Sequence, residues 1–256
     1  MIEARGVTKR YGETVVVDGV TVALKKGGLT AIIGPNGAGK STLLSMVSRL
    51  LGMDAGTVEI DGLDVTKTPS DILAKRLSIL RQDNQISARL TVRELVAFGR
   101  YPHSKGRPTL DDKRRVEEAL AYLGLEALGE RFLDELSGGQ RQRAFVAMVL
   151  AQDTDTLLLD EPLNNLDLKH AVGMMQLLRR AADELGKTVV VVLHDINFAS
   201  AYADRILAMK DGRLAFEGTA DEVIRPDVLK DLYEIDIDVQ VIAGQRIGLY
   251  FRPPLL

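Results

Sequence analysis

The segment GPNGAGKS at residues 34–41 decides how the rest of this sequence is interpreted. It follows an apolar run at residues 29–33 that predicts a β-strand, and it precedes a helical pattern over residues 40–51. The glycines let backbone N–H groups turn toward phosphate oxygens, and the helix start adds the positive end of its dipole. Strand, glycine loop and helix in this order are typical of a phosphate-binding P-loop, in which Lys40 neutralises phosphate charge and Ser41 ligates Mg²⁺. A chance glycine turn beside a surface lysine would need neither flanking element.

A second candidate for chemistry is the acidic end of the apolar run TLLLDE at residues 156–161. The apolar residues predict a buried strand, which places Asp160 at its carboxyl end, where it can reach a Mg²⁺ shell. Glu161 then orients or deprotonates the attacking water. An acid pair at a strand end is, by itself, often only the start of a solvated loop. The P-loop upstream favours the catalytic interpretation.

The third motif, LSGGQ at residues 136–140, decides the family. Taken alone it predicts a glycine-rich helix start in which Ser137 and Gln140 form a capping box. Together with the P-loop, the acidic strand end and His194, in this order, it resembles the signature of the ABC ATPase family. The resemblance implies an α/β fold of the P-loop NTPase class, with a mainly parallel core sheet, an N-terminal antiparallel β subdomain and an inserted helical subdomain.

The same resemblance implies ATP and Mg²⁺ as cofactors and a head-to-tail homodimer, in which each signature loop contacts the γ-phosphate held by the other subunit's P-loop. Gln82 matches the Q-loop glutamine, which touches Mg²⁺ or water, and His194 matches the switch histidine, which bonds the γ-phosphate. Asp167 matches the D-loop that crosses the dimer. Tyr11 matches the aromatic residue that stacks on adenine. A lone glutamine at a strand end would more often be solvated, and a lone histidine there would more often be structural.

The candidate site residues fall into three groups by the role that the motifs and the resemblance give them. The catalytic group is Glu161, His194 and Gln82, and the metal group is Ser41, Gln82 and Asp160. The nucleotide-binding group is Tyr11, Gly34, Pro35, Asn36, Gly37, Ala38, Gly39, Lys40, Ser41, Thr42, Ser137, Gly138, Gly139, Gln140 and Asp167.

Composition narrows the environment of the chain. Its 256 residues carry a net charge of only −3, which argues against a nucleic-acid partner, and it has no cysteine. The start is mixed and charged, unlike a secretory signal, and the longest strongly apolar run, near residues 189–193, is far short of the roughly 20 residues that span a bilayer. We therefore expect a cytosolic protein that, if it serves a membrane, does so from outside the bilayer. Together with the family resemblance, this predicts a peripheral protein at the cytoplasmic face of the membrane.

The pattern along the chain predicts alternating elements around one helical insertion. We expect a catalytic RecA-like core with its β subdomain at residues 1–84 and 153–226, a helical signature subdomain at 85–152, and a tail at 227–256 without an assigned function. Strands are predicted at 14–17, 20–24, 29–33, 56–60, 77–80, 156–159, 188–193, 205–209 and 213–217, the last pair joined by a hairpin at Asp211 and Gly212, and a helix at 169–185. A further capping box is predicted at Thr109 and Asp112.

Residues 91–103 indicate a branch of the family. TVRELV followed by FGRYPH looks like the iron-siderophore, haem and cobalamin importer branch, and so does LNNLD at 163–167, where asparagines replace the commoner serine and alanine. In the family this region forms the groove for a permease helix. The resemblance places that groove near Gln82, Arg93, Phe98 and Tyr101, with Leu95 as part of its wall.

The expected function is an ATP-hydrolysing subunit that energises import of an iron-siderophore complex through a separate permease, with an extracytoplasmic substrate-binding protein acting indirectly. Haem or cobalamin import remains open. A soluble ABC ATPase that clamps nucleic acid is the alternative from another class. A P-loop kinase would leave residues 137–140 unexplained. Arg81 stands where the family often has proline, which leaves the local geometry of Gln82 open.

Overall fold

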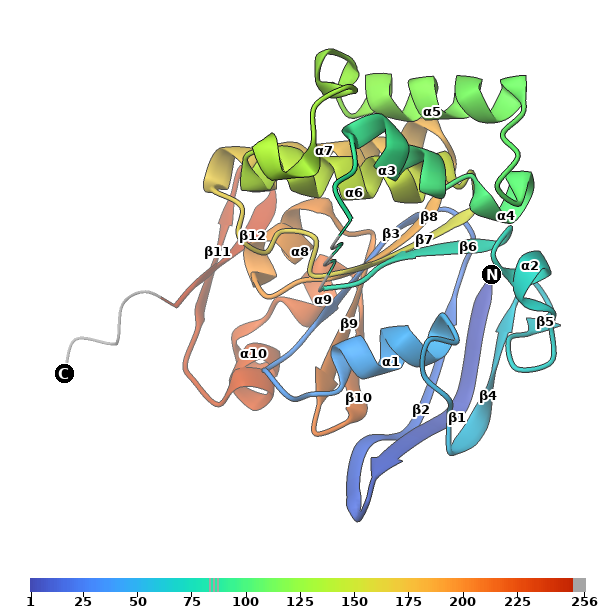
Figure 1. Ribbon diagram of the computed structural model, residues 1–256. Helices are drawn as coiled ribbons and strands as arrows, with labels where there is room; N and C mark the ends of the chain where they lie inside the picture. The colour runs from blue at the N-terminus through green and yellow to red at the C-terminus, as the bar shows by residue number, and fades with distance from the viewer. Residues whose placement is uncertain (83, 85, 87, 251–256) are drawn as a thin grey trace. The chain divides into compact units, whose positions relative to one another are not determined.

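The computed structural model describes residues 1–82, 84, 86 and 88–250, and its two compact units each combine helices and strands (Figure 1). Unit 1 is formed by Met1–Lys67 together with Thr188–Leu256, and unit 2 by Thr68–Lys187. The α/β fold class predicted from the sequence is confirmed.

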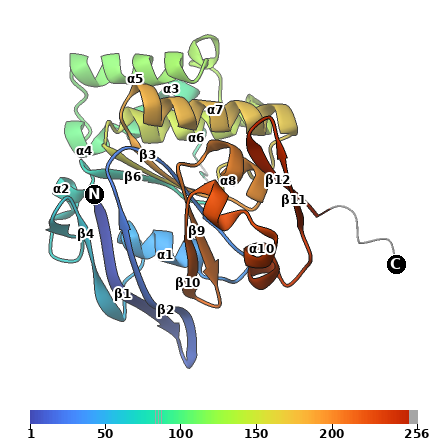
Figure 2. The same cartoon turned by 180° about the vertical axis from the view of Figure 1, so that it is seen from behind.

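An antiparallel sheet in unit 1 has the strand order β2-β1-β4-β5 and is seen from behind in Figure 2. Its strands are β1 (Ile2–Tyr11), β2 (Thr14–Leu24), β4 (Ala55–Ile60) and β5 (Leu63–Asp64). The two strands predicted within β2 are one strand, and β1 was not predicted. Register shifts along the β1–β2 pair disturb the alternation of buried and exposed residues, so the period of two is hard to recognise in the sequence.

The parallel strands of unit 1 carry the P-loop. β3 (Gly28–Ile33) pairs in parallel with both β8 (Thr188–Val192) and β9 (Arg205–Lys210), and β9 pairs antiparallel with β10 (Arg213–Gly218). Every residue of β8 is buried, as expected for a strand covered on both faces. The predicted hairpin is confirmed, because Asp211 and Gly212 both have positive φ, 49° and 76°.

The helices of unit 1 are α1 (Lys40–Val47), α8 (Ile196–Tyr202), α9 (Ala220–Val223) and α10 (Pro226–Tyr233), and a hairpin of β11 (Asp238–Ile242) and β12 (Gln245–Leu249) follows α10. The helix predicted to Leu51 ends earlier. Arg49 has φ of 59°, and the backbone N–H groups of Leu50 and Leu51 both donate to the Ser45 carbonyl in a turn that closes the helix.

In unit 2, β6 (Leu77–Leu80) and β7 (Thr156–Asp160) pair in parallel. The predicted helical stretch contains α3 (Val92–Phe98), α4 (Tyr101–Ser104), α5 (Leu110–Tyr122) and α6 (Gly138–Ala151), with 3₁₀ turns at Glu126–Leu128 and Leu133–Glu135. α3, α5 and α6 pack side by side (Figures 1 and 2). The remaining helices are α2 (Ser70–Leu73) and α7 (Leu168–Glu184).

Two predicted capping boxes are confirmed in unit 2. Thr109 accepts from the backbone N–H of Asp112 at the start of α5, and Ser137 accepts from that of Gln140 at the start of α6. Each capping box sets where its helix begins, so the signature motif stands at a fixed helix N-terminus. In the described ranges, every helix is too short or too polar to span a bilayer.

Candidate functional site

The P-loop of unit 1 has a backbone that only glycine can adopt at its two ends. Gly34 has φ of 141°, and a Cβ there would lie 2.1 Å from the Met209 carbonyl oxygen. Gly39 has φ of 89°, and a Cβ there would lie 2.5 Å from the Val16 carbonyl oxygen. At Gly37, φ is 80° and a Cβ would meet no atom within 4 Å. The loop is therefore held tightly at its ends, and its middle glycine borders open space, as a cradle for phosphate requires.

Lys40 holds its ammonium group over this loop. The side chain is 5% exposed, and Nζ donates to the carbonyl oxygens of Gly34 at 2.9 Å and Pro35 at 2.8 Å. α1 begins at Lys40, so the positive end of its dipole and the ammonium charge lie at the same loop. Both favour an anion, which makes this loop suited to a polyphosphate.

His194 emerges beside the P-loop in the same unit. In the β3–β8 pair, Ile32 is opposite Val192, and the Leu193 N–H donates to the Ile32 carbonyl at 3.0 Å. The carboxyl ends of the two parallel strands therefore meet at one edge, where β3 leads into the P-loop and β8 into His194. The imidazole is exposed at that edge, and Asp195, the next residue, caps α8. An imidazole here is suited to recognising a phosphate group near the loop.

Tyr11 ends β1 with a ring that is 54% exposed. The Lys9 ammonium lies 5.6 Å from the ring centroid, a cation–π distance. An exposed ring can offer its face to a base, as the sequence predicts for adenine.

In unit 2, the acidic pair lies at the end of β7. Asp160 is 7% exposed and Glu161 is 8% exposed, and Glu161 has φ of 51°. The Glu161 Oε2 atom accepts from Gln82 Nε2 at 2.7 Å and from Asn164 Nδ2 at 2.5 Å. Two amide groups therefore fix the direction of a buried carboxylate, as a general base needs. The sequence had placed Asn164 in the D-loop, but it gave no sign of this bond.

The signature loop begins α6 and packs against the start of α7. The Ser137 N–H donates to Gln140 Oε1 at 3.0 Å, which completes the capping box. A Cβ at Gly139 would lie 2.7 Å from the His170 Cδ2 atom, whereas one at Gly138 would meet only the Asn165 carbonyl oxygen, at 3.6 Å. Gly139 is thus required by close packing within the chain, and the exposed Gly138 is not.

Asp167, the D-loop aspartate, caps α7. Its Oδ1 accepts from the His170 backbone N–H at 2.8 Å and lies 2.6 Å from His170 Nδ1. The backbone bond, followed by the side-chain bond, lowers the pKa of Asp167 below its usual range. His170 joins the D-loop to the signature loop and was missed by the sequence analysis, although an aspartate three residues before a histidine at a helix start is a capping signal.

The region predicted to form the permease groove is only partly exposed. Phe98 is 55% exposed and Tyr101 is 59% exposed. Leu95 is fully buried, so the prediction that it lines the groove wall was wrong. Leu95 lies on α3, which packs against α5 and α6, and its side chain is buried in this packing. The Arg93 side chain pairs with Glu117 and, at 2.7 Å, with Glu130.

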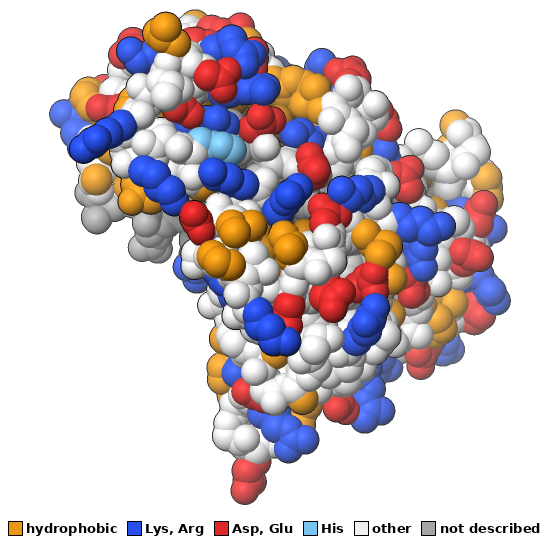
Figure 3. Space-filling view, turned by 90° about the vertical axis from the view of Figure 1, so that its right-hand side faces the viewer, with side chains coloured by type: hydrophobic (Ala, Val, Ile, Leu, Met, Phe, Trp, Pro, Cys, Tyr) orange, Lys and Arg blue, Asp and Glu red, His pale blue; other side chains and the backbone are white. Residues whose placement is uncertain are grey.

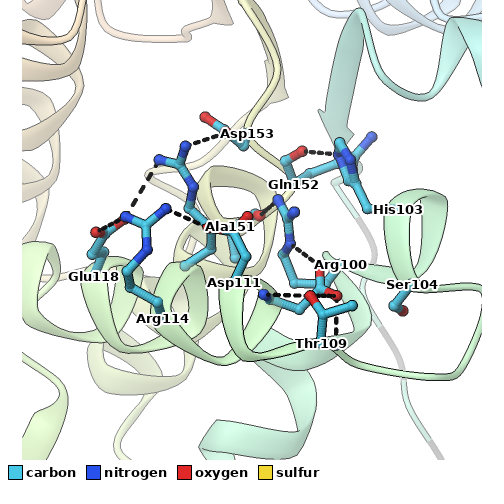
Figure 4. A network of polar contacts seen from close by, with 12 residues as sticks. Arg100, His103, Ser104, Thr109, Asp111, Arg114, Glu118, Ala151, Gln152 and Asp153 are labelled. Carbon is cyan, nitrogen blue, oxygen red and sulfur yellow. Dashed lines mark hydrogen bonds and ion pairs between the residues drawn. The ribbon is translucent and has the colours of Figure 1, made fainter.

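A buried ion pair joins Arg100 to Asp112, and Figure 4 shows Arg100 within its network of polar contacts. Arg100 donates to Asp112 Oδ1 at 2.9 Å and to the Ala151 carbonyl at 2.8 Å, and both charged side chains are 5% exposed. The Thr109 backbone N–H, with help from the Thr109 hydroxyl and Arg100, lowers the pKa of Asp112 to about 2. The pair ties α4 and α5 to the end of α6. No sequence signal had identified it.

The next residues along α4 extend this network to the surface. His103 Nε2 lies 2.9 Å from the Gln152 carbonyl oxygen, and Gln152 Nε2 donates to the carbonyls of Ala74 and Leu77. On the face shown in Figure 3, acidic and basic side chains are interspersed. Arg114 and Glu118, one turn apart on α5, form one such exposed ion pair (Figure 4).

The structure thus brings several predicted residues together within each unit. In unit 1 the P-loop and His194 share one strand edge. In unit 2 Gln82 contacts Glu161, and the signature loop contacts the helix capped by Asp167. A glycine cradle at a helix start and a buried strand-end carboxylate held by an amide define the P-loop NTPase class.

Comparison with known proteins identifies the family within that class. The family model described as ABC transporter matches residues 17–164, and this chain belongs to the ABC transporter family as an ATP-binding ATPase. It is 54% identical to the petrobactin import ATP-binding protein YclP of Bacillus subtilis (strain 168) over 98% of this chain and 100% of that protein. It is 43% identical to the iron(3+)-hydroxamate import ATP-binding protein FhuC of the same organism over 90% of this chain and 86% of that protein.

Solved structures agree with this assignment. A bacterial ABC transporter cassette, solved as a dimer, matches with a TM-score of 0.77 and 34% identity over 86% of this chain and 99% of that chain. A transporter described as of the metal-chelate type, in an inward-facing conformation, matches with a TM-score of 0.84 and 25% identity over 97% of each chain. The fold predicted from the signature motif is therefore confirmed.

Proposed function

We propose that this chain binds and hydrolyses ATP to energise import of an iron-siderophore complex through a separate membrane permease. The observation that carries the ATPase is the P-loop of unit 1, whose glycine backbone, helix start and Lys40 ammonium suit a polyphosphate. The cargo rests on likeness to relatives named for petrobactin and iron(3+)-hydroxamate import. Their likeness extends over nearly the whole chain, which favours the same kind of cargo here.

The phosphates would be bound by backbone N–H groups of the P-loop, and adenine by the exposed ring of Tyr11. Lys40 would neutralise β/γ-phosphate charge, and the first turn of α1 would contribute N–H groups and hydroxyls. The P-loop residues assigned to this role are Gly34, Pro35, Asn36, Gly37, Ala38, Gly39, Lys40, Ser41 and Thr42.

Ser41, Asp160 and Gln82 would hold the Mg²⁺ that accompanies the nucleotide. All three offer oxygen atoms, which are the ligands that Mg²⁺ prefers, and magnesium in nucleotide sites uses few carboxylates because the phosphates supply the rest. When bound, the ion would neutralise charge that develops on the phosphate oxygens. Family membership and the chemistry of each side chain support this grouping.

Glu161 would act on the attacking water and His194 would recognise the γ-phosphate. The carboxylate is buried and fixed by amide donors, so it needs little reorganisation to accept a proton. Gln82 donates directly to that carboxylate, and it would also contact the Mg²⁺ shell and the docked permease. The proposal therefore connects the chemistry to the partner through one amide side chain.

The working unit would be a head-to-tail homodimer in which Ser137, Gly138, Gly139 and Gln140 of one subunit cover the γ-phosphate bound by the other. An exposed Gly138 at a capped helix N-terminus favours contact with an anion from outside the chain. Asp167 would add the D-loop contact across the dimer. A related cassette is described as dimeric, in agreement with this arrangement.

The permease would dock near Gln82, Arg93, Phe98 and Tyr101. The exposed rings of Phe98 and Tyr101 suit the apolar face of a short helix, and Arg93 adds a charged rim. The chain would then lie at the cytoplasmic face of the membrane, with an extracytoplasmic binding protein delivering the cargo on the other side. In this scheme residues 85–152 work as a helical signature subdomain, residues 1–84 and 153–226 as the catalytic core, and residues 227–256 follow as a tail.

Uptake measurements test the cargo. A strain lacking this chain is expected to lose uptake of labelled iron from at least one siderophore, with recovery by the wild-type chain and none by Glu161→Gln. If uptake of every iron-siderophore complex is normal and uptake of labelled haem or cobalamin is lost, the cargo is haem or cobalamin and the siderophore proposal is wrong. Normal uptake of all of them would contradict a transport function and favour a soluble ABC ATPase.

Purified protein tests the chemistry. Glu161→Gln is expected to keep ATP binding while turnover falls at least a hundredfold or so, the scale expected when a general base is lost. Undiminished hydrolysis in that variant would contradict the role of Glu161, whatever the cargo.

A further inference from the structure

The C-terminal part of unit 1, to which the sequence assigned no role, packs on the helix that follows His194. Figure 2 shows β12 beside α8, and α8 is capped by Asp195, the residue after the histidine. Whatever fixes α8 therefore also fixes where the chain leaves His194.

Asn197 makes the most specific contact between these elements. Its Nδ2 donates to the Gly248 carbonyl at 3.2 Å, and the Gly248 N–H donates to its Oδ1 at 2.8 Å. The amide thus pairs with β12 as a backbone peptide would, satisfying a donor and an acceptor of the same residue. One turn later, Ser200 Oγ donates to the Arg246 carbonyl at 2.6 Å.

Apolar contacts at the same place leave no room for a side chain on β12. A Cβ at Gly248 would lie 2.6 Å from Ile196 Cδ1 and 3.3 Å from Ile237 Cγ2. Both isoleucines are 4% exposed. The close approach of the strand to α8 is therefore sealed from water, which strengthens the hydrogen bonds beside it.

Two tyrosines extend this contact toward the segment after His194 and toward the P-loop. Burial, followed by the negative charge of Asp195 and a hydrogen bond to its side chain, raises the pKa of Tyr250. The Tyr233 hydroxyl at the end of α10 is buried beside the P-loop. Burial raises the pKa of Tyr233, and the backbone N–H of Gly34, which faces the hydroxyl, opposes that shift. The same C-terminal segment thus reaches the residue after His194 and the first glycine of the P-loop.

We infer that residues 226–250 act as a brace for γ-phosphate recognition, and that Asn197 is a positioning residue that sets His194 through α8. This inference rests on the role of His194 in the proposed function. A brace of this kind affects ATP more than ADP, because only ATP carries the phosphate that His194 recognises. Loss of a purely structural contact would lower the affinity for ATP and for ADP equally.

The test compares ATP and ADP binding to the full chain, with Glu161→Gln in every protein to prevent turnover. Asn197→Ala removes both bonds to Gly248, so ATP affinity is expected to fall about tenfold with ADP affinity unchanged. Ser200→Ala removes one bond and is expected to give a smaller shift of the same sign. Gln240→Ala is the matched control. It deletes an exposed amide of the same hairpin, whose Nε2 donates to Asp238 on the same strand, and it should change neither affinity.

His194→Ala separates the inference from its premise. If His194→Ala lowers the ATP-to-ADP affinity ratio while Asn197→Ala and Ser200→Ala lower only the melting temperature, the brace is refuted and the proposed function stands. If His194→Ala itself leaves the ratio unchanged, the role of the histidine is refuted and the inference falls with it. Should Asn197→Ala fail to fold, the Ser200→Ala result decides by the same criterion.

Discussion

At the scale of single residues, the P-loop glycines differ in what surrounds them, and this difference can be measured. Gly39→Ala adds a methyl group 2.5 Å from the Val16 carbonyl and strains a backbone at φ of 89°. Gly37→Ala has similar strain, at φ of 80°, but meets open space. Left-handed backbone costs a non-glycine residue roughly 1–2 kcal/mol, so Gly37→Ala should lose about that much unfolding free energy and Gly39→Ala clearly more. Urea unfolding checks this; equal losses would show that the backbone contact is unimportant.

The signature loop offers a second residue-scale prediction. Gly139→Ala is expected to reduce ATPase activity strongly, because its methyl group would collide with the His170 ring 2.7 Å away. Adding His170→Ala removes the obstacle and should restore part of the activity. Gly138→Ala, with its nearest contact at 3.6 Å, serves as the control and should fold normally. Absence of any recovery in the double variant would locate the defect elsewhere than in this packing.

At the scale of elements, the buried ion pair between α4 and α5 makes stability depend on acid. The pKa of Asp112 is lowered to about 2 from an ordinary 3.8, so its contribution is complete above pH 4 and is lost as the pH falls through about 2. Asp112→Asn should therefore be less stable at neutral pH and show a flatter loss of stability between pH 4 and pH 2. Removing one partner of a buried pair costs about 3–5 kcal/mol.

The neighbouring Asp111 supplies the matched control for that measurement. It pairs with Arg114 on the exposed side of α5, where an ion pair is worth at most about 1 kcal/mol. Asp111→Asn should change the urea midpoint at neutral pH very little. A loss as large as that of Asp112→Asn would mean that charge on the helix, and not the buried pair, sets the stability.

Element by element, what the sequence could predict was local. The P-loop, the capping boxes at α5 and α6 and the Asp211–Gly212 hairpin depend on a few adjacent residues, and all have the predicted geometry. β1 and the C-terminal elements escaped prediction because register shifts and charges hide their period. Contacts such as Asn164 with Glu161, Arg100 with Asp112 and Asn197 with Gly248 depend on packing between elements, which no local pattern records.

At the scale of the whole molecule, a composite site in a head-to-tail dimer predicts complementation between two inactive chains. Lys40→Ala removes the ammonium of the P-loop but leaves the signature intact, whereas Gly138→Arg blocks the signature with an exposed side chain and leaves the P-loop intact. A mixture should form one complete site per mixed dimer. ATP-dependent capture of one tagged chain by the other, in a Glu161→Gln background, measures it. Capture no better than with either variant alone would contradict the shared site.

The supports of the P-loop have a consequence for how this protein is made. Gly34 rests against Met209, and Gly39 rests against Val16 near Gly212, so the loop's scaffold comes from both early and late parts of the sequence. A ribosome synthesises the glycine loop long before it reaches β9 and the turn after it. During translation the P-loop therefore stays unsupported, and the nascent chain should gain the ability to hold nucleotide only after β9 and the turn at Gly212 have emerged.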